Sequence, residues 1–316
     1  MPLSPAFLVA AGALVIGTMF VGVVFLSEVV AVWQGCGCMF DKNRHHMNSN
    51  EPLRGIMANL VEQQREHFNR VSEKYVLARK HPNHLLLKDL IWREFIRRNA
   101  SIASEVHHVL EPMCGMGEGY SILNANLTTH FDYLGFDYSE RMVDFARNHN
   151  PDLNIETNDV TTYQARGNQF DLIILVGGLH HVYSRTQEVL INLRKSLRPG
   201  GFFVSFEPTH NNWFARRIRH RIYESNDLFD ADTEQGFEYR DLDLYFKRAG
   251  YVKVDEVYPG LLAYILYYNP DAFPAFNVGG KFLVRGLFAL DRLFWSGWIG
   301  RKLSFATMSI WKRRDE

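Results

Sequence analysis

The chain has few cysteines and no excess of charge of either sign. Only Cys36, Cys38 and Cys114 occur among its 316 residues, so a small fold held together by disulfides is not expected. The 35 basic and 35 acidic residues give a formal net charge of zero. Proteins that bind nucleic acid through an overall basic field need a surplus of Lys and Arg. We therefore expect no nucleic-acid partner.

Cys36 and Cys38 form a C-x-C pair beside an apolar segment. A metal site would need further ligands at a usual spacing, and the sequence offers none, so we expect no metal. The plain interpretation is two thiols next to a membrane. Lipidation of these cysteines stays open as the alternative.

Lysine and arginine are absent before Lys42, and this absence bears on the N-terminal apolar run. From Ala6 to Trp33 the only ionisable residue is Glu28. A helix of that length can cross a hydrocarbon core of about 30 Å. A secretory signal peptide, the competing interpretation, would begin with basic residues and have a shorter apolar stretch. The sequence predicts a transmembrane anchor within 1–36, and the basic residues that follow it predict a cytoplasmic location for the rest of the chain.

After a linker and helix start at 37–66, strand-like and helix-like segments alternate along the chain. Periodicity predicts strands at 106–110, 133–136, 153–157, 170–176 and 202–206, and helices at 84–98, 119–129, 140–149 and 187–197. The run FDLIILV is apolar throughout, as expected for a strand buried on both faces. The alternation predicts the α/β class, with a doubly wound, mostly parallel sheet that binds ligands outside the carboxyl ends of its strands.

The residues at these strand ends suit a nucleotide-like ligand. Gly115, Gly117 and Gly119 follow the first strand, where they permit a tight turn and close approach of a ligand. The helix after this loop offers free N–H groups to an anion. Asp137, about 20 residues later, is positioned to accept hydrogen bonds from ribose hydroxyls. Asp159 follows the third strand, where its side chain could bind an adenine amino group.

Five segments resemble, in order and spacing, the motifs of class I methyltransferases that use S-adenosylmethionine (SAM): VLEPMCGMGEGY, YLGFDYSERMVDFA, ETNDV, FDLIILVGGLHHV and LRKSLRPGGFFVSFEP. A further segment, HFNRVSEKY, resembles the helix before the core in methyltransferases of the ubiquinone and menaquinone pathway type. The resemblance covers about 68–206. It implies a Rossmann-like, seven-stranded sheet whose last strand, at 304–311, is antiparallel, in a catalytic domain at 67–316. It also implies SAM as the cofactor.

The resemblance assigns the cofactor pocket residue by residue. Glu111 and the glycine loop would hold the methionine part of SAM, Asp137 would hold the ribose, and Asp159 with Val160 would flank the adenine. The cofactor-binding set that we expect is Tyr75, Glu111, Gly115, Gly117, Asp137, Tyr138, Met142, Asp159, Val160 and Gly177. The chain departs from the family at Met113, where glycine is usual, which puts the shape of the loop and the affinity for SAM in question.

A nicotinamide-binding Rossmann domain is the nearest competing interpretation. A glycine-rich loop alone does not separate the two classes. Here no clean G-x-G-x-x-G opens the helix, and the later motifs fit the methyltransferase pattern better.

Four residues at the rim of the expected site are candidates for catalysis. His180 and His181 follow the fourth strand, where either could act as a general base, orient the acceptor, or only shape the pocket. Glu207, at the end of the fifth strand, could bind or deprotonate the acceptor, or be a satisfied hydrogen-bonding residue. His210 is expected to face the same region.

Two segments outside the core pattern, 208–240 and 260–301, bear on the acceptor. The first has a basic run at 216–221 that could neutralise a phosphate-bearing headgroup. The second has a helix-like stretch at 281–299 that is too charged for an easy span and suits the membrane interface. A core-packing helix with a charged outer side is its alternative.

These features predict membrane lipids as partners and a lipid-linked or hydrophobic small-molecule acceptor for the enzyme. A catalytically inactive SAM-binding scaffold or regulatory subunit at a membrane is the alternative from another class. Met113 favours the scaffold, whereas the retained acidic residues Glu111, Asp137 and Asp159 oppose it.

Overall fold

The computed structural model of the chain describes Glu62, Arg65, Glu66, Asn69, Leu77 and residues 79–165, 167–211, 236–268, 270 and 277–315. The predicted anchor at 1–36, the linker at 37–66 apart from three of these residues, and the insertion at 212–235 lie outside the described residues. Within the part of the chain that is described, no helix is both long and apolar enough to cross a membrane.

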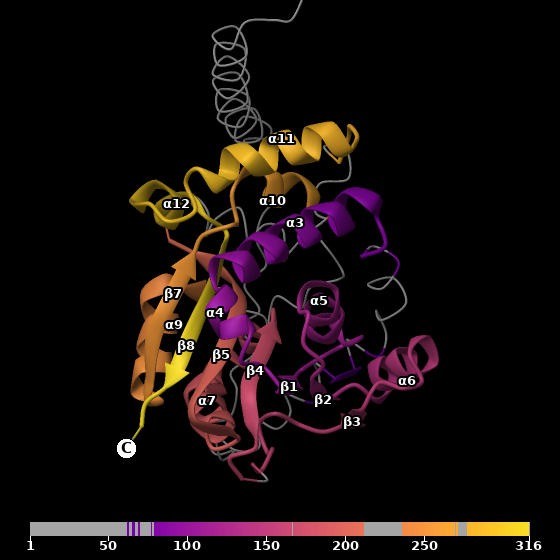
Figure 1. Cartoon of the computed structure of the whole chain (residues 1–316), viewed down its shortest axis with the longest axis vertical. Helices are drawn as coiled ribbons and strands as arrows, with labels where there is room; N and C mark the ends of the chain where they lie inside the picture. The colour runs from indigo at the N-terminus through magenta and orange to yellow at the C-terminus, as the bar shows by residue number, and fades with distance from the viewer. Residues whose placement is uncertain are drawn as a thin grey trace, which may run out of the picture. The chain divides into compact units, whose positions relative to one another are not determined.

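A mixed eight-stranded sheet forms the centre of the described domain (Figure 1). Seven strands follow the order β3-β2-β1-β4-β5-β8-β7, and the short β6 pairs with β5 off this path. The strands are β1 His108–Pro112, β2 Asp132–Asp137, β3 Ile155–Thr157, β4 Phe170–Val176, β5 Leu197–His210, β6 Phe237–Glu238, β7 Tyr251–Val257 and β8 Ala306–Arg313.

Strands β1 to β5 pair in parallel, and β8 runs antiparallel to both of its neighbours, β5 and β7. The predicted Rossmann-like, mostly parallel sheet with an antiparallel last strand is therefore confirmed. The predicted number of strands omitted β6, because two residues are too few to give a periodicity.

Helices cover both faces of the sheet, and alternate residues of β4 reach the two sides. Leu172 and Ile174 join the core under α3, α5 and α6, whereas Ile173 and Leu175 join the core under α7 and α9. The helical elements are α3 Pro82–Arg98, α4 Ala100–Ala103, α5 Glu118–Asn126, α6 Glu140–His149, the 3-10 helix η1 Leu179–Arg185, α7 Thr186–Arg194, α9 Tyr239–Arg248, α10 Leu262–Tyr267, α11 Lys281–Arg292 and α12 Trp298–Leu303. A strand buried on both faces needs apolar side chains at every position, as its sequence has.

The element boundaries follow local chemistry in most places. Helix α6 begins after Ser139, whose hydroxyl accepts a hydrogen bond from Met142 N, so the predicted bounds and N-cap are confirmed. The helix predicted to run to Leu197 ends instead at Arg194. Leu197 already belongs to β5 and pairs with Phe170, so the Pro-Gly-Gly turn lies inside an irregular strand rather than at a helix end.

The stretch at 281–299, which the sequence suggested as one amphipathic helix, is divided in the structure between α11 and the start of α12. Helix α11 packs on α3 and α10, and the chain turns after Arg292 before α12 begins at Trp298. Asp291, almost fully buried, accepts hydrogen bonds from the backbone N–H groups of Leu262 and Ala263 at 3.2 and 2.7 Å. This carboxylate caps the first turn of α10 and ties the two helices together.

Candidate functional site

The loop between β1 and α5 is built around the buried carboxylate of Glu111. Its two oxygens accept hydrogen bonds from Gly119 N at 2.7 Å, Tyr120 N at 2.9 Å and the Tyr133 hydroxyl at 2.7 Å. Burial raises the pKa of Glu111 to about 7 although all three hydrogen bonds lower it. A Cβ on Gly119 would lie 2.8 Å from this carboxyl, so only glycine fits there. The carboxylate of Glu111 thus fixes the conformation of the loop.

Three residues of this loop adopt positive φ angles. Met113 has φ 54°, Gly115 52° and Gly117 75°. Glycine tolerates this region freely, whereas a side chain costs energy there. The departure from the family pattern at Met113 therefore falls where the backbone itself favours glycine. The Met113 sulfur would lie only 3.1 Å from a Cβ on Gly178, so its side chain packs against the turn after β4.

Asp137 joins the end of β2 to the glycine loop. Its Oδ2 accepts a hydrogen bond from Gly115 N at 2.8 Å and its Oδ1 one from Ser139 N at 2.9 Å. Burial raises the pKa of Asp137, whereas these N–H groups lower it. The carboxylate lies beside the loop at the carboxyl edge of the sheet. Its predicted contact with ribose stays a prediction.

The remaining cofactor candidates lie along the same edge, except Tyr75, which is outside the described residues. Asp159 accepts hydrogen bonds at 2.8 Å from both the backbone N–H and the hydroxyl of Thr161, and Val160 is buried beside it. The Tyr138 hydroxyl donates to Glu62 at 3.0 Å. The Met142 methyl would lie 3.5 Å from a Cβ on Gly115. These residues lie at or near the ends of β2 and β3, and their contact with a cofactor stays a prediction.

Glu207 and His180 form a buried pair at the ends of β5 and β4. Glu207 Oε1 accepts hydrogen bonds from Gly178 N at 3.0 Å and Leu179 N at 2.8 Å, and its Oε2 lies 3.0 Å from His180 Nδ1. Burial raises the pKa of Glu207 to about 8, against the lowering effect of the N–H groups. Glu207 makes its contacts to the turn after β4 and to His180, which agrees with the alternative of a satisfied hydrogen-bonding residue. Binding or deprotonation of the acceptor by Glu207 stays a prediction.

The other histidine candidates differ in their surroundings. The His181 ring centroid is 4.0 Å from that of His180, so these two side chains lie next to each other. Gly177, with φ 66°, leaves 3.8 Å between a hypothetical Cβ and His180 Cε1. His210 ends β5, where it pairs with Glu238 of β6. A chemical role for any of them stays a prediction.

Sequence reasoning missed an aromatic cluster beside the end of β5. The ring of Phe206 lies 5.4 Å from Tyr268, 6.1 Å from Tyr264 and 5.9 Å from Trp92, measured between centroids. His84 Nδ1 lies 2.6 Å from the carbonyl oxygen of Tyr268. These residues come from α3, β5 and the segment around α10. No periodicity joins segments so far apart, although the aromatic composition of LLAYILYY was a signal.

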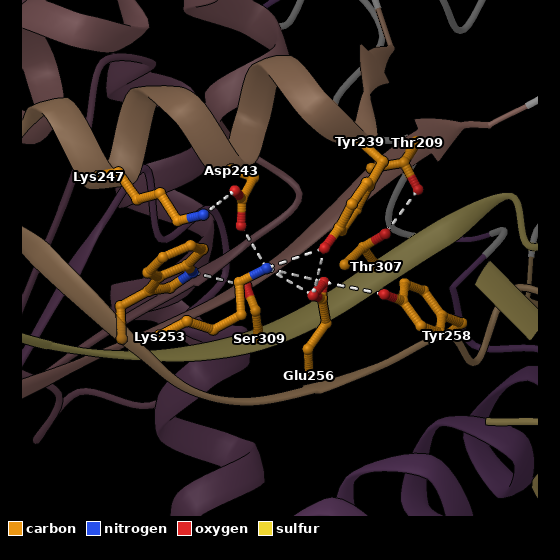
Figure 2. A network of polar contacts seen from close by, with 10 residues as sticks. Thr209, Tyr239, Asp243, Lys247, Lys253, Glu256, Tyr258, Thr307 and Ser309 are labelled. Carbon is orange, nitrogen blue, oxygen red and sulfur yellow. Dashed lines mark hydrogen bonds and ion pairs between the residues drawn. The ribbon is translucent and has the colours of Figure 1, made fainter. Parts of the chain in front are cut away.

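A polar network outside this site fixes the antiparallel edge of the sheet (Figure 2). Lys253 on β7 contacts Asp243 of α9, and its Nζ lies 2.6 Å from Glu256 Oε1. The hydroxyls of Tyr239 and Tyr258 both donate to Glu256, at 3.0 and 3.1 Å. Burial opposes the charge on Lys253, but the hydrogen bonds to Asp243 and Glu256 raise its pKa, so the lysine stays charged. We assign this network a structural role.

Comparison with known proteins agrees with this architecture. Residues 109–201 match the family described as a methyltransferase domain. The chain is similar to a SAM-dependent methyltransferase from Archaeoglobus fulgidus, with 15% identity and a TM-score of 0.50 over 76% of this chain and 99% of that one. It is also similar to one from Thermotoga maritima, with 13% identity and a TM-score of 0.52 over 79% and 99%. At such identities the likeness concerns the fold. The comparison with curated proteins gave no match.

The sheet order, the glycine loop and the acidic residue after β2 define a Rossmann-like methyltransferase domain. The chain therefore contains a methyltransferase domain at 109–201, and an enzyme of this kind takes its methyl group from SAM.

The residues present fit SAM well. The left-handed turns at Gly115 and Gly117 bring bare backbone to the carboxyl edge of the sheet, and the first turn of α5 follows directly. Asp137 lies at the position that suits ribose hydroxyls. We expect these groups to hold the cofactor between β1 and β4, where the strand order reverses.

Proposed function

We propose that this methyltransferase is anchored in a membrane, with its catalytic domain in the cytoplasm, and that it methylates a lipid-linked or membrane-soluble acceptor. The aromatic cluster beside β5 is the observation that carries the proposal. Phe206 lies at the carboxyl end of β5, and Tyr264 and Tyr268 cover it from the inserted segment. These rings are buried in the core at this end of the sheet, and an aromatic, apolar surrounding would favour an apolar acceptor over a charged metabolite.

The acceptor class that fits is a prenylated quinone precursor, an isoprenoid-linked glycan or another lipid. The apolar run from Ala6 to Trp33 supports the anchor, and the basic residues after it, Lys42 and Arg44, support a cytoplasmic domain. The resemblance of HFNRVSEKY to the quinone-pathway type supports the same class of acceptor.

SAM supplies an already activated methyl group, so the chain itself has three tasks. It must hold the acceptor in line with that group, exclude water, and take up a proton where the acceptor is a hydroxyl or a carbon acid. His180 is the candidate for the proton, because Glu207 holds its Nδ1 and thereby orients the ring. With the proton of the pair on Nδ1, the basic lone pair is on Nε2.

The test is transfer of tritium from methyl-labelled SAM by the full chain in vesicles that contain a total lipid extract. We expect label in the organic phase, and its loss in Asp137→Ala, since that carboxylate ties the glycine loop to β2. Asp132→Ala, an exposed carboxyl at the start of the same strand, is the matched control. Label confined to water-soluble products would refute the lipid acceptor. SAM binding with no transfer to any acceptor would favour an inactive scaffold.

A further inference from the structure

An uncharged stripe runs along the outward side of α11. Four positions at spacings of four, three and four lie along one side of this helix: Phe282, Gly286, Ala289 and Leu293. All four are exposed, and the exposed fraction is 94% for Phe282 and 74% for Leu293. A Cβ at Gly286 would meet no atom within 4 Å, so nothing in the described residues covers the middle of this stripe. A helix that faces water usually has its polar residues on this side.

The apolar stripe continues beyond α11. Of the fourteen large apolar side chains that are exposed in the described residues, seven lie between 282 and 303. They form what we call the α11–α12 surface: Phe282, Leu283, Leu293, Phe294, Trp298, Ile299 and Leu303. Scattered apolar residues on a surface are ordinary, but a cluster of this kind marks an interaction site.

Basic residues of the same segment border this surface, and one of them, Arg292, is paired with Glu94 of α3 at 3.3 Å. Residues 277–305 contain five Lys and Arg and one acid, Asp291, which is buried. Lys281 and Arg285 lie on one flank of α11, and neither has an ion-pair partner among the residues that the structure describes. An apolar centre with a basic border suits anionic lipid headgroups. Two copies of the chain face to face would bring these cations together, which disfavours a dimer through this surface.

The α11–α12 surface lies at the same end of the domain as the aromatic cluster. Helix α11 packs on α10 and α3, and Tyr264 of α10 contacts Phe206 at the carboxyl end of β5. Figure 1 shows α11, α10 and α3 at the end of the sheet toward which the arrow of β4 points. Whatever binds the outward side of α11 is therefore separated from the aromatic cluster by one layer of helices.

We propose that the α11–α12 surface lies in the headgroup region of an anionic bilayer, with its apolar stripe toward the acyl chains and its basic border toward the phosphates. This inference rests on the membrane-resident acceptor of the proposed function. It adds a surface that would orient the aromatic cluster toward the membrane. This surface does not depend on the apolar run from Ala6 to Trp33.

The test uses the full chain with Cys36→Ser and Cys38→Ser, so that an introduced cysteine is the accessible thiol; Cys114 is buried. Phe282→Cys is labelled with a nitrobenzoxadiazole fluorophore and reconstituted in vesicles of phosphatidylcholine and phosphatidylglycerol in equal parts. We expect a blue-shifted emission that lipids spin-labelled on the acyl chain quench. A label at Ile191→Cys, exposed on α7, should stay in water and unquenched.

Charge is tested in the same preparation. Lys281→Gln with Arg285→Gln should lower the ratio of docked to undocked label about 30-fold, since each cation near an anionic surface contributes to binding. Arg240→Gln with Arg248→Gln, on exposed positions of α9, removes as much charge elsewhere and should change little. A label at Phe282 that stays in water overturns the proposal. So does a label shielded from water but not quenched by lipid, which would mean protein covers this side. SAM binding and organic-phase transfer, measured on the same samples, report separately on the proposed function.

Discussion

Met113 is the one residue other than glycine that has a positive φ angle among the residues that the structure describes. At φ 54° a side chain adds strain that glycine does not feel. At most positions alanine is more stable than glycine, but here we expect the order to reverse. Met113→Gly should be more stable than Met113→Ala by about 1 kcal/mol, because only the glycine relieves the left-handed strain.

Both variants lose the methionine side chain, so the contribution of that loss to the free energy of unfolding cancels when the two are compared. Chemical denaturation of the two proteins measures the difference in the free energy of unfolding. Equal stabilities would mean that the loop relaxes away from φ 54° without cost. We also expect tighter SAM binding by Met113→Gly in calorimetry, since a glycine loop is the geometry that the family uses.

At the scale of elements, Glu207 links the end of β5 to the turn after β4 and to η1. Because burial raises its pKa to about 8, the carboxyl is largely protonated at neutral pH and ionises above it. The ionised form accepts a hydrogen bond from the N–H at His180 Nδ1, which puts the basic lone pair on Nε2. We therefore expect the rate of methyl transfer to rise as pH increases from about 7 to 9.

The variant Glu207→Gln tests whether the ionisation of Glu207 controls the rate of methyl transfer. The amide keeps an oxygen for the N–H groups of Gly178 and Leu179 but presents an NH₂ group to His180. We expect a loss of about 100-fold in the transfer rate, with SAM affinity kept and the alkaline rise gone. The matched control is Glu188→Gln, on an exposed side chain of α7. A variant that keeps both the rate and its pH dependence would show that Glu207 only shapes the turn.

Elements with strong local signals could be predicted from the sequence, and elements fixed by distant partners could not. The apolar run of β4 and the Ser139 cap of α6 are local, and both were predicted at their observed bounds. The start of β5 depends on pairing with Phe170, which lies 27 residues before Leu197, so the sequence suggested helix there. The two-residue β6 exists only through its pairing with Thr209 and His210.

The same limit applies to the site. The glycine loop, Asp137 and the two adjacent histidines are motif residues, and each was predicted by position. That Glu207 would hold His180 depends on the register between β4 and β5, and that Phe206 would meet Tyr268 depends on how α10 folds back. Contacts between residues far apart in the sequence leave no periodic pattern in it, so they could not be predicted from the sequence.

At the scale of the whole molecule, buried carboxyls with raised pKa values make stability depend on pH. Burial raises the pKa of Asp137, and the rise reaches a stated value for three others among the described residues. Burial raises the pKa of Glu111 to about 7, that of Glu207 to about 8 and that of Asp291 to about 7. In the unfolded chain each carboxyl returns to its ordinary pKa, 4.5 for the two glutamates and 3.8 for the aspartate. Between the unfolded and the folded pKa the folded protein binds more protons than the unfolded one, so its stability must fall as pH rises.

We therefore expect the melting temperature to be highest near pH 5 and to decrease up to about pH 8, with each group contributing up to about 1.4 kcal/mol per pH unit within its window. Differential scanning calorimetry of the full chain in detergent, at constant ionic strength and without SAM, measures this. Carboxyls with lowered pKa values, such as Glu94 and Asp255, act in the opposite sense but at lower pH. Glu207→Gln should flatten the upper part of the decrease, whereas Asp132→Asn, on an exposed side chain, should leave the curve unchanged. A melting temperature that stays constant or rises between about pH 5 and 8 would show that these carboxyls are ionised in the folded protein, and would remove the basis for an alkaline rise in the rate.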